Sequence, residues 1–242
     1  FPNFTIDSVE VVDTGSSFET AVYIRQRLKG APQLYSGVPL ELSFLIEQGD
    51  STTITIYMSG ECGVFTTVLP FQPAFIGIDL EEKISDAITD KYYWIDSTGS
   101  YDFAEANMEI AVNQTAVNAM LRVEHHWVAP DPFINPIPGL HISRERYWKV
   151  DGLKVDQLDA IATIRYNGSN SYSGGFLDNE LFTNNEDSLV LLYREGAGQE
   201  WSLYPTYTLD VQTNVNNRRG LIEIDGLLPG EYALGIYDIS RP

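Results

Sequence analysis

The sequence contains very little cysteine. A single residue, Cys62, stands among 242, so the chain can form no internal disulfide, no zinc site built on cysteine pairs and no dithiol redox pair. Cys62 lies in the segment 59–63, whose small residues are typical of a turn, and a catalytic thiol needs a neighbouring base to form its thiolate. We therefore expect no catalytic role for this thiol.

Positive charge is also scarce. The 15 Lys and Arg residues face 34 Asp and Glu residues, for a formal net charge of -19. Proteins bind duplex nucleic acids and anionic membrane surfaces through clustered cations. Here the cations are scattered, apart from the pairs Arg144/Arg146 and Arg218/Arg219. No apolar run approaches the roughly 20 residues of a bilayer-spanning helix. We expect neither a nucleic-acid partner nor membrane insertion.

The rest of the composition is that of a globular protein. With 43% hydrophobic and 12% aromatic residues, the chain can bury a core, which an acidic disordered tail cannot do. Its length suits one large or two ordinary domains. It begins at Phe1 without a Met or a signal peptide, which favours a mature or excised fragment. We expect an exported protein, extracellular, on the cell surface or periplasmic, that relies on core packing without disulfides.

Nearly every apolar segment alternates with a period of two, which predicts half-buried β-strands. The predicted strands of the first half are residues 4–11, 20–26, 38–46, 53–58, 63–69 and 74–80. Those of the second half are residues 106–112, 119–128, 147–150, 160–166, 188–194, 207–212, 220–224 and 232–237. Short strands at such spacings are typical of β-sandwiches. The predicted fold is all-β, with two tandem β-sandwich domains, the first immunoglobulin-like and the second ending in a closing hairpin around residues 226–230.

Two segments compete as the domain boundary. Residues 129–139 contain four prolines, as a linker often does, whereas residues 96–100 are small and polar and leave enough strands on each side for a sandwich. Because of the strand count, we predict domains at residues 1–97 and 98–242. The proline-rich segment is then a long loop within the second domain. Residues 80–88 are the best helix candidate, with Ile84 and Ile88 on one face; a loop followed by a strand is the alternative.

The only histidine cluster is His125 and His126, with His141 further along. Neighbouring residues of a strand point to opposite faces, so this pair cannot chelate one ion as two histidines four apart on a helix do. A site formed by one of them with His141 and Asp131 remains open. Because three or four ligands would have to converge, we expect instead one buried and one exposed structural histidine.

Two loops offer candidate binding residues. Asp178, Asn184 and Asp187 are candidate calcium ligands, although their spacing matches no EF-hand and a solvated acidic loop is the alternative. The second candidate is an aromatic platform for stacking sugars, formed by Trp201, Tyr204 and Tyr207 together with residues 92–94. Its alternative is core packing, since aromatic residues favour strands.

Motifs of catalysis are missing from the sequence. It has no Gly-x-Ser-x-Gly elbow and no glycine-rich phosphate loop, and its many acids form close pairs by chance. We predict no catalytic residues, no enzymatic activity of this chain by itself, and no cofactor apart from the candidate calcium.

Several segments resemble secreted zinc aminopeptidases of the aminopeptidase N family, especially those of Bacteroidetes. Segments 23–27 (YIRQR), 37–42 (GVPLEL) and 69–80 (LPFQPAFIGIDL) are similar to the immunoglobulin-like domain that follows the catalytic domain in that family. Segments 146–150 (RYWKV), 191–194 (LLYR) and 226–237 (GLLPGEYALGIY) look like a C-terminal module of such proteins. The family's catalytic signature, His-Glu-x-x-His with a distant Glu, is missing, so no functional residue carries over.

The resemblance implies a non-catalytic C-terminal accessory region of an exported metallopeptidase, whose partner is the catalytic domain of the same parent chain. The alternative is a cell-surface adhesion or carbohydrate-binding module, whose partner is a glycan or a protein surface. An upstream His-Glu-x-x-His in the same polypeptide would distinguish the two.

Overall fold

The computed structural model describes residues 1–169, 177–182, 185–211 and 217–240. The predicted all-β class is confirmed, since the chain is built of antiparallel sheets. It divides into two compact units, Phe1–Ile88 and Thr89–Pro242. Among the described residues, no helix has the length and apolar character that crossing a membrane requires.

The division of the chain falls before the segment that the sequence favoured. Strand β7 (Ile88–Ile95) pairs with β10 (Ala119–His126) in a sheet of the second unit, although residues 88–95 precede the predicted boundary at 97/98. The small polar residues after β7 form the turn into β8 (Gly99–Phe103), so they connect two strands of one unit. The proline-rich segment 129–139 lies within the second unit.

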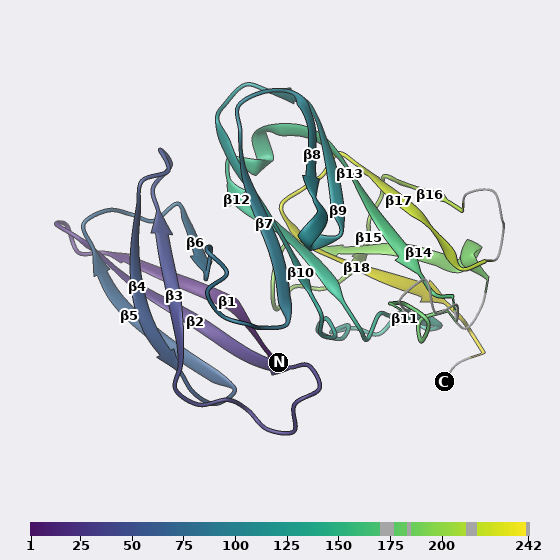
Figure 1. Cartoon of the computed structure of the whole chain (residues 1–242), viewed down its shortest axis with the longest axis horizontal. Coiled ribbons are helices and arrows are strands. Elements are labelled where there is room, and N and C mark those ends of the chain that lie inside the picture. Colours follow the sequence, from purple (N-terminus) through teal and green to yellow (C-terminus); the bar gives the residue numbers. More distant parts are fainter. Residues whose placement is uncertain (170–176, 183–184, 212–216, 241–242) are drawn as a thin grey trace. The chain divides into compact units, whose positions relative to one another are not determined.

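The first unit contains two three-stranded sheets, β1-β2-β5 and β4-β3-β6. The strands are β1 (Pro2–Asp13), β2 (Phe18–Leu28), β3 (Val38–Leu45), β4 (Ser51–Met58), β5 (Cys62–Leu69) and β6 (Phe75–Ile78). Figure 1 shows β3 and β4 crossing over β1, β2 and β5. Alternation directs Val22 and Ile24 of one sheet, and Leu40 and Leu42 of the other, into one shared core.

The helix predicted at residues 80–88 is not formed, and the alternative of a loop followed by a strand is correct. Asp79 has a left-handed backbone conformation, with φ of 46°. Its carboxylate accepts hydrogen bonds from the backbone N–H groups of Lys83 and Ile84, both at 3.0 Å. This side chain satisfies the backbone of a compact turn in place of helical hydrogen bonds, and β7 begins at Ile88.

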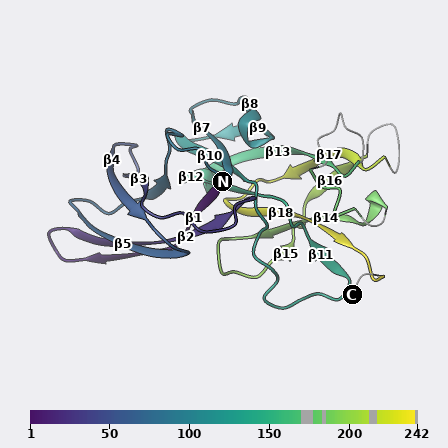
Figure 2. The same ribbon diagram turned by 60° about the horizontal axis from the view of Figure 1, so that its bottom comes forward.

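The second unit contains a seven-stranded and a five-stranded sheet. The first has the order β15-β14-β18-β12-β10-β7, with β11 paired to β18, and the second has the order β16-β17-β13-β9-β8. The remaining strands are β9 (Met108–Thr115), β11 (Leu140–Ile142), β12 (Tyr147–Leu153), β13 (Leu158–Asn167), β14 (Leu189–Arg194), β15 (Ser202–Leu203), β16 (Tyr207–Asp210), β17 (Arg219–Asp225) and β18 (Gly230–Tyr237). Within the described ranges, short 3-10 helices lie at Ala104–Ala106, Val155–Gln157 and Glu186–Ser188. In Figure 2, β13, β16 and β17 form a layer above β14, β15 and β18.

The predicted closing hairpin is wrong, although both of its strands exist. β17 pairs with β13 and β16, whereas β18 pairs with β12, β14 and β11. The turn at residues 226–230 therefore carries the chain from one sheet to the other. Ile222 and Ile224 reach the same core as Tyr232 and Leu234, from opposite sides. A strand can bury its apolar face against a strand of the facing sheet across the core, without pairing with that strand edge to edge.

Candidate functional site

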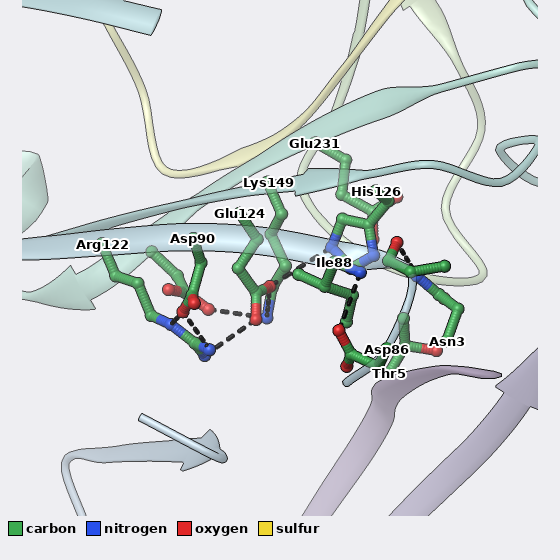
Figure 3. A network of polar contacts seen from close by, with 12 residues as sticks. Asn3, Thr5, Asp86, Ile88, Asp90, Arg122, Glu124, His126, Lys149 and Glu231 are labelled. Carbon is green, nitrogen blue, oxygen red and sulfur yellow. Dashed lines mark hydrogen bonds and ion pairs between the residues drawn. The ribbon is translucent and has the colours of Figure 1, made fainter. Parts of the chain in front are cut away.

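One face of the seven-stranded sheet carries a row of paired charges (Figure 3). On β10, Val123 points into the core, so its neighbours Arg122 and Glu124 point to the opposite face. The strand register sets Glu124 opposite Lys149 and Arg122 opposite Asp151 on β12. Cross-strand pairs of opposite charge stabilise a sheet, and this register alternates their signs.

The ion pairs of this row are short and mutually reinforcing. Nε and Nη2 of Arg122 both donate to the carboxylate of Asp90, and its Nη1 lies 2.7 Å from Glu124. Nζ of Lys149 lies 2.6 Å from Asp151. Burial alone would raise the pKa of Glu124, but the charges of Arg122 and Lys149 hold that pKa well below its ordinary value. Glu124 is therefore ionised and paired at neutral pH, which suits structural support better than proton transfer.

Both histidines of the cluster are fully buried, which corrects the expectation that one would be exposed. The ring of His125 stacks on Trp148, with centroids 4.9 Å apart, and the ring of His126 stacks on Tyr147 at 4.3 Å. Nδ1 of His125 lies 3.1 Å from the side-chain amide of Asn107. The two imidazoles thus serve as flat packing groups in different surroundings.

The open alternative of a metal site with His141 and Asp131 is not supported. Nε2 of His141 lies 3.1 Å from the carbonyl oxygen of Asp238, and the carboxylate of Asp131 accepts a hydrogen bond of 2.8 Å from Arg194. Throughout the described ranges, no group of three or more His, Cys, Asp or Glu side chains is placed to hold a metal ion.

The buried His125 makes a pH-dependent contribution to stability. Burial, with the charges of Arg146 and His126, lowers the pKa of His125 well below its ordinary 6.5. Below about pH 6.5 the unfolded chain binds a proton that the native chain excludes, so stability is full above this pH and decreases as the pH falls. We expect His125→Phe, which keeps a ring against Trp148, to remove this pH dependence. Below about pH 6.5 the free energy of unfolding of the variant should therefore fall less steeply than that of the original chain, by up to about 1.4 kcal/mol per pH unit. Urea denaturation at several pH values checks this; equal slopes for both proteins would contradict it.

Of the three calcium candidates, the structure describes Asp178 and Asp187. Asp178 is fully buried and forms two hydrogen bonds with Arg146, from Nε to Oδ1 at 2.9 Å and from Nη2 to Oδ2 at 2.7 Å. It also accepts the backbone N–H of Asn167 at 2.7 Å. Asp187 is exposed, and Asn184 lies outside the described residues. Asp178 therefore binds a guanidinium group of its own chain in place of calcium.

The residues of the predicted aromatic platform are divided between the core and the surface: Tyr92 and Trp94 are exposed, whereas the others are buried or half-buried. Trp201 and Tyr204 are buried, and Tyr207 packs half-buried against the core. The indole Nε1 of Trp201 donates to the carbonyl oxygen of Asp131 at 2.9 Å, and the guanidinium of Arg194 covers its ring at 4.5 Å. Packing and hydrogen bonding occupy these rings, so the alternative of core packing is correct for Trp201 and Tyr204.

A pocket of about 470 Å³ lies in the second unit, at a place that the sequence reasoning did not single out. Its lining consists of residues 129, 130, 132 and 133 (the proline-rich wall), β11 with Ser143 and Arg144, and Glu180 with Leu181 (the 180–181 wall). Such a volume is typical of small-ligand sites. The four prolines of residues 129–139 were the sequence signal for this pocket, because proline stiffens a loop outside the strands.

Residues behind both walls hold the pocket in shape. The carboxylate of Glu200 accepts hydrogen bonds from the backbone N–H groups of Ile134 and Asn135, at 3.1 and 2.7 Å, and from the Asn135 side chain at 2.8 Å. Burial alone would raise the pKa of Glu200, but these hydrogen bonds lower it. Asp131, bound by Trp201, fixes the start of this wall, and Asp178 fixes the wall opposite. Asp178 and Trp201, which the sequence suggested as ligand-binding residues, thus stabilise the pocket lining.

The polar side chains of the pocket lining are those of His141, Ser143, Arg144 and Glu180, and the His141 ring contacts the carbonyl oxygen of Asp238. Arg144 is exposed and, in the part of the chain that the structure describes, its guanidinium has no hydrogen-bond or ion-pair partner. The hydroxyl oxygen of Ser143 accepts the backbone N–H of Glu145 at 3.3 Å and keeps its own proton to donate. Glu180 supplies the one carboxylate of the lining.

Comparison of the chain with models of protein families, with curated proteins and with solved structures gives no match. The function is therefore argued from the residues and their geometry.

Proposed function

We propose that this chain is a non-catalytic accessory region of an exported metallopeptidase, in which the first unit is an immunoglobulin-like sandwich that packs on the catalytic domain. The parent family is the one that the segments of the sequence resemble. The shared core of the sheets β1-β2-β5 and β4-β3-β6 supports the assignment of the first unit.

The pairing and burial of ionisable side chains in the second unit support a non-catalytic role. Glu124 is paired with cations, Asp178 is bound by Arg146, and His125 stacks in the core with its pKa lowered. A general acid or base needs a pKa near the working pH and access to substrate. These groups instead serve the packing of the sheets.

The observation that carries the docking proposal is the outer edge of β5. This eight-residue strand, CGVFTTVL, contains no charge although the chain carries -19. It ends its sheet, pairing only with β2 among the described strands. Val64 and Val68 point outward and are 56% and 63% exposed. Uncharged edge strands with exposed apolar side chains mark interaction sites, and the catalytic domain of the parent chain is the partner proposed for this one.

The reading frame that encodes this chain tests the proposal first. We expect it to encode His-Glu-x-x-His upstream in the same polypeptide. In that full-length protein, the double substitution Val64→Lys with Val68→Lys is expected to weaken the contact between the first unit and the catalytic domain. The rate of proteolytic cleavage between the catalytic domain and this chain should then rise several-fold. Tyr57→Lys, at an exposed residue of the other sheet, is the control and should leave cleavage unchanged. A reading frame without the zinc motif, or cleavage insensitive to the lysines at 64 and 68, would overturn the proposal.

One observation favours the alternative of a carbohydrate-binding or adhesion module. Tyr92 and Trp94 alternate on the edge strand β7 and are 37% and 40% exposed, so their rings are available for stacking where those of Trp201 and Tyr204 are not. Absence of the zinc motif, together with glycan binding that Trp94→Ala abolishes, would favour this alternative.

A further inference from the structure

The pocket of the second unit combines apolar side chains with Arg144, whose guanidinium has no hydrogen-bond or ion-pair partner among the described residues. Phe133, Leu140 and Leu181 contribute to the wall, and Arg144 lies in the same lining. A guanidinium group offers a planar fork of donors that matches a carboxylate in two parallel hydrogen bonds. Arg144 is exposed, so it remains accessible to a carboxylate that enters from solvent.

The charges around the pocket favour a ligand with one negative charge. Arg144 can neutralise one charge, and Glu180 in the same lining repels any further anionic group. The net charge of -19 adds a long-range repulsion. A phosphate monoester carries close to two negative charges at neutral pH, which this lining does not balance. A carboxylate carries one, and the hydroxyl proton of Ser143 is available as a further donor.

The walls are positioned before any ligand arrives. Glu200 and Trp201 hold the proline-rich wall, and the pair Arg146–Asp178 holds the wall that carries Leu181. A preformed site avoids the entropic cost of ordering loops on binding. An apolar side chain can thus enter between walls that are already spaced to receive it.

We infer that this pocket binds an apolar carboxylate of the kind found at the C-terminal end of a short apolar peptide, with Arg144 on the carboxylate and the apolar wall around the side chain. The inference concerns the second unit alone and does not depend on the parent protein of the proposed function.

Isothermal titration calorimetry of the whole chain with N-acetyl-leucyl-leucine tests the inference. The free acid is expected to bind with a Kd at least about tenfold lower than that of the C-terminal amide, since the amide cannot form the charged pair. Acetate, which has the carboxylate without the apolar body, is expected to compete poorly. No binding of the acid, equal binding of acid and amide, or equal competition by acetate would each overturn the inference.

Variants of the arginine locate the binding. Arg144→Gln is expected to raise the Kd of the acid about tenfold and leave that of the amide unchanged, whereas Arg144→Lys should recover part of the affinity. Arg165→Gln, at an exposed arginine of β13 outside the pocket, is the matched control and should bind like the original chain. Equal denaturation midpoints show that the variants are folded. Unchanged affinity in Arg144→Gln would overturn the assignment.

Discussion

Replacing Asp178 by alanine is expected to lower the free energy of unfolding of the second unit by about 3–5 kcal/mol. The side chain of Arg146 is fully buried and is held by two hydrogen bonds to Asp178. Without that carboxylate, a desolvated positive charge remains unpaired, and the N–H of Asn167 loses its acceptor. Urea denaturation followed by tryptophan fluorescence measures the change, because all four tryptophans of the chain lie in the second unit.

Asp187→Ala is the matched control for this loss. Asp187 is exposed and its carboxylate forms no hydrogen bond or ion pair with the described residues, so we expect a change within about 0.5 kcal/mol. Equal effects of the two substitutions would contradict the structural role of Asp178. Calcium that stabilises the original chain but not Asp178→Ala would instead restore the interpretation of this residue as a metal ligand.

Gly152→Ala is expected to destabilise the second unit by a similar amount, about 3–5 kcal/mol. A Cβ atom at Gly152 would lie 2.0 Å from the backbone oxygen of Met120, and the φ of 135° strains any residue with a side chain. The strain costs about 1–3 kcal/mol, and relieving the overlap by moving β10 against β12 costs about as much again. Because the obstacle is main chain, no rotamer change can remove it. Thermal and urea denaturation measure the loss.

Gly99→Ala separates strain from collision. Gly99 also has a positive φ, 155°, but no atom lies within 4 Å of the added Cβ. Its substitution is therefore expected to cost only the conformational part. If the two alanine variants were equally stable, the close approach of β10 and β12 at Gly152 would not be a constraint on the fold.

The strands were largely predictable because alternation is a local signal. Segments 20–26 and 38–46 carry core-facing apolar residues at every second position, such as Val22 and Ile24 or Leu40 and Leu42, and these segments form β2 and β3. The same signal could not assign strands to sheets. The segment from 220 to 237 correctly predicted strand, turn and strand, but whether β17 and β18 pair depends on β13 and β14, which lie elsewhere in the chain.

The candidate site was less predictable from the sequence than the strands, because its contacts join residues that are distant in the chain. Asp178 in an acidic loop and Trp201 among aromatics were reasonable binding candidates by composition. Their roles depend on partners that are distant in sequence: Arg146 is 32 residues from Asp178, and Asp131 is 70 residues from Trp201. Neither local segment indicates that Asp178 will bind a buried guanidinium group or that Trp201 will donate to a carbonyl oxygen.

The sequence by itself determined that this protein is all-β and strongly acidic, because alternation and charge are properties of neighbouring residues and of simple sums. Only the tertiary structure decided that residues 89–95 belong to the second unit and that both histidines of the cluster are buried. It also brought Arg144 into one pocket lining with residues of the proline-rich segment, Glu180 and Leu181. A pocket is made of segments that meet only after folding, and no single segment encodes it.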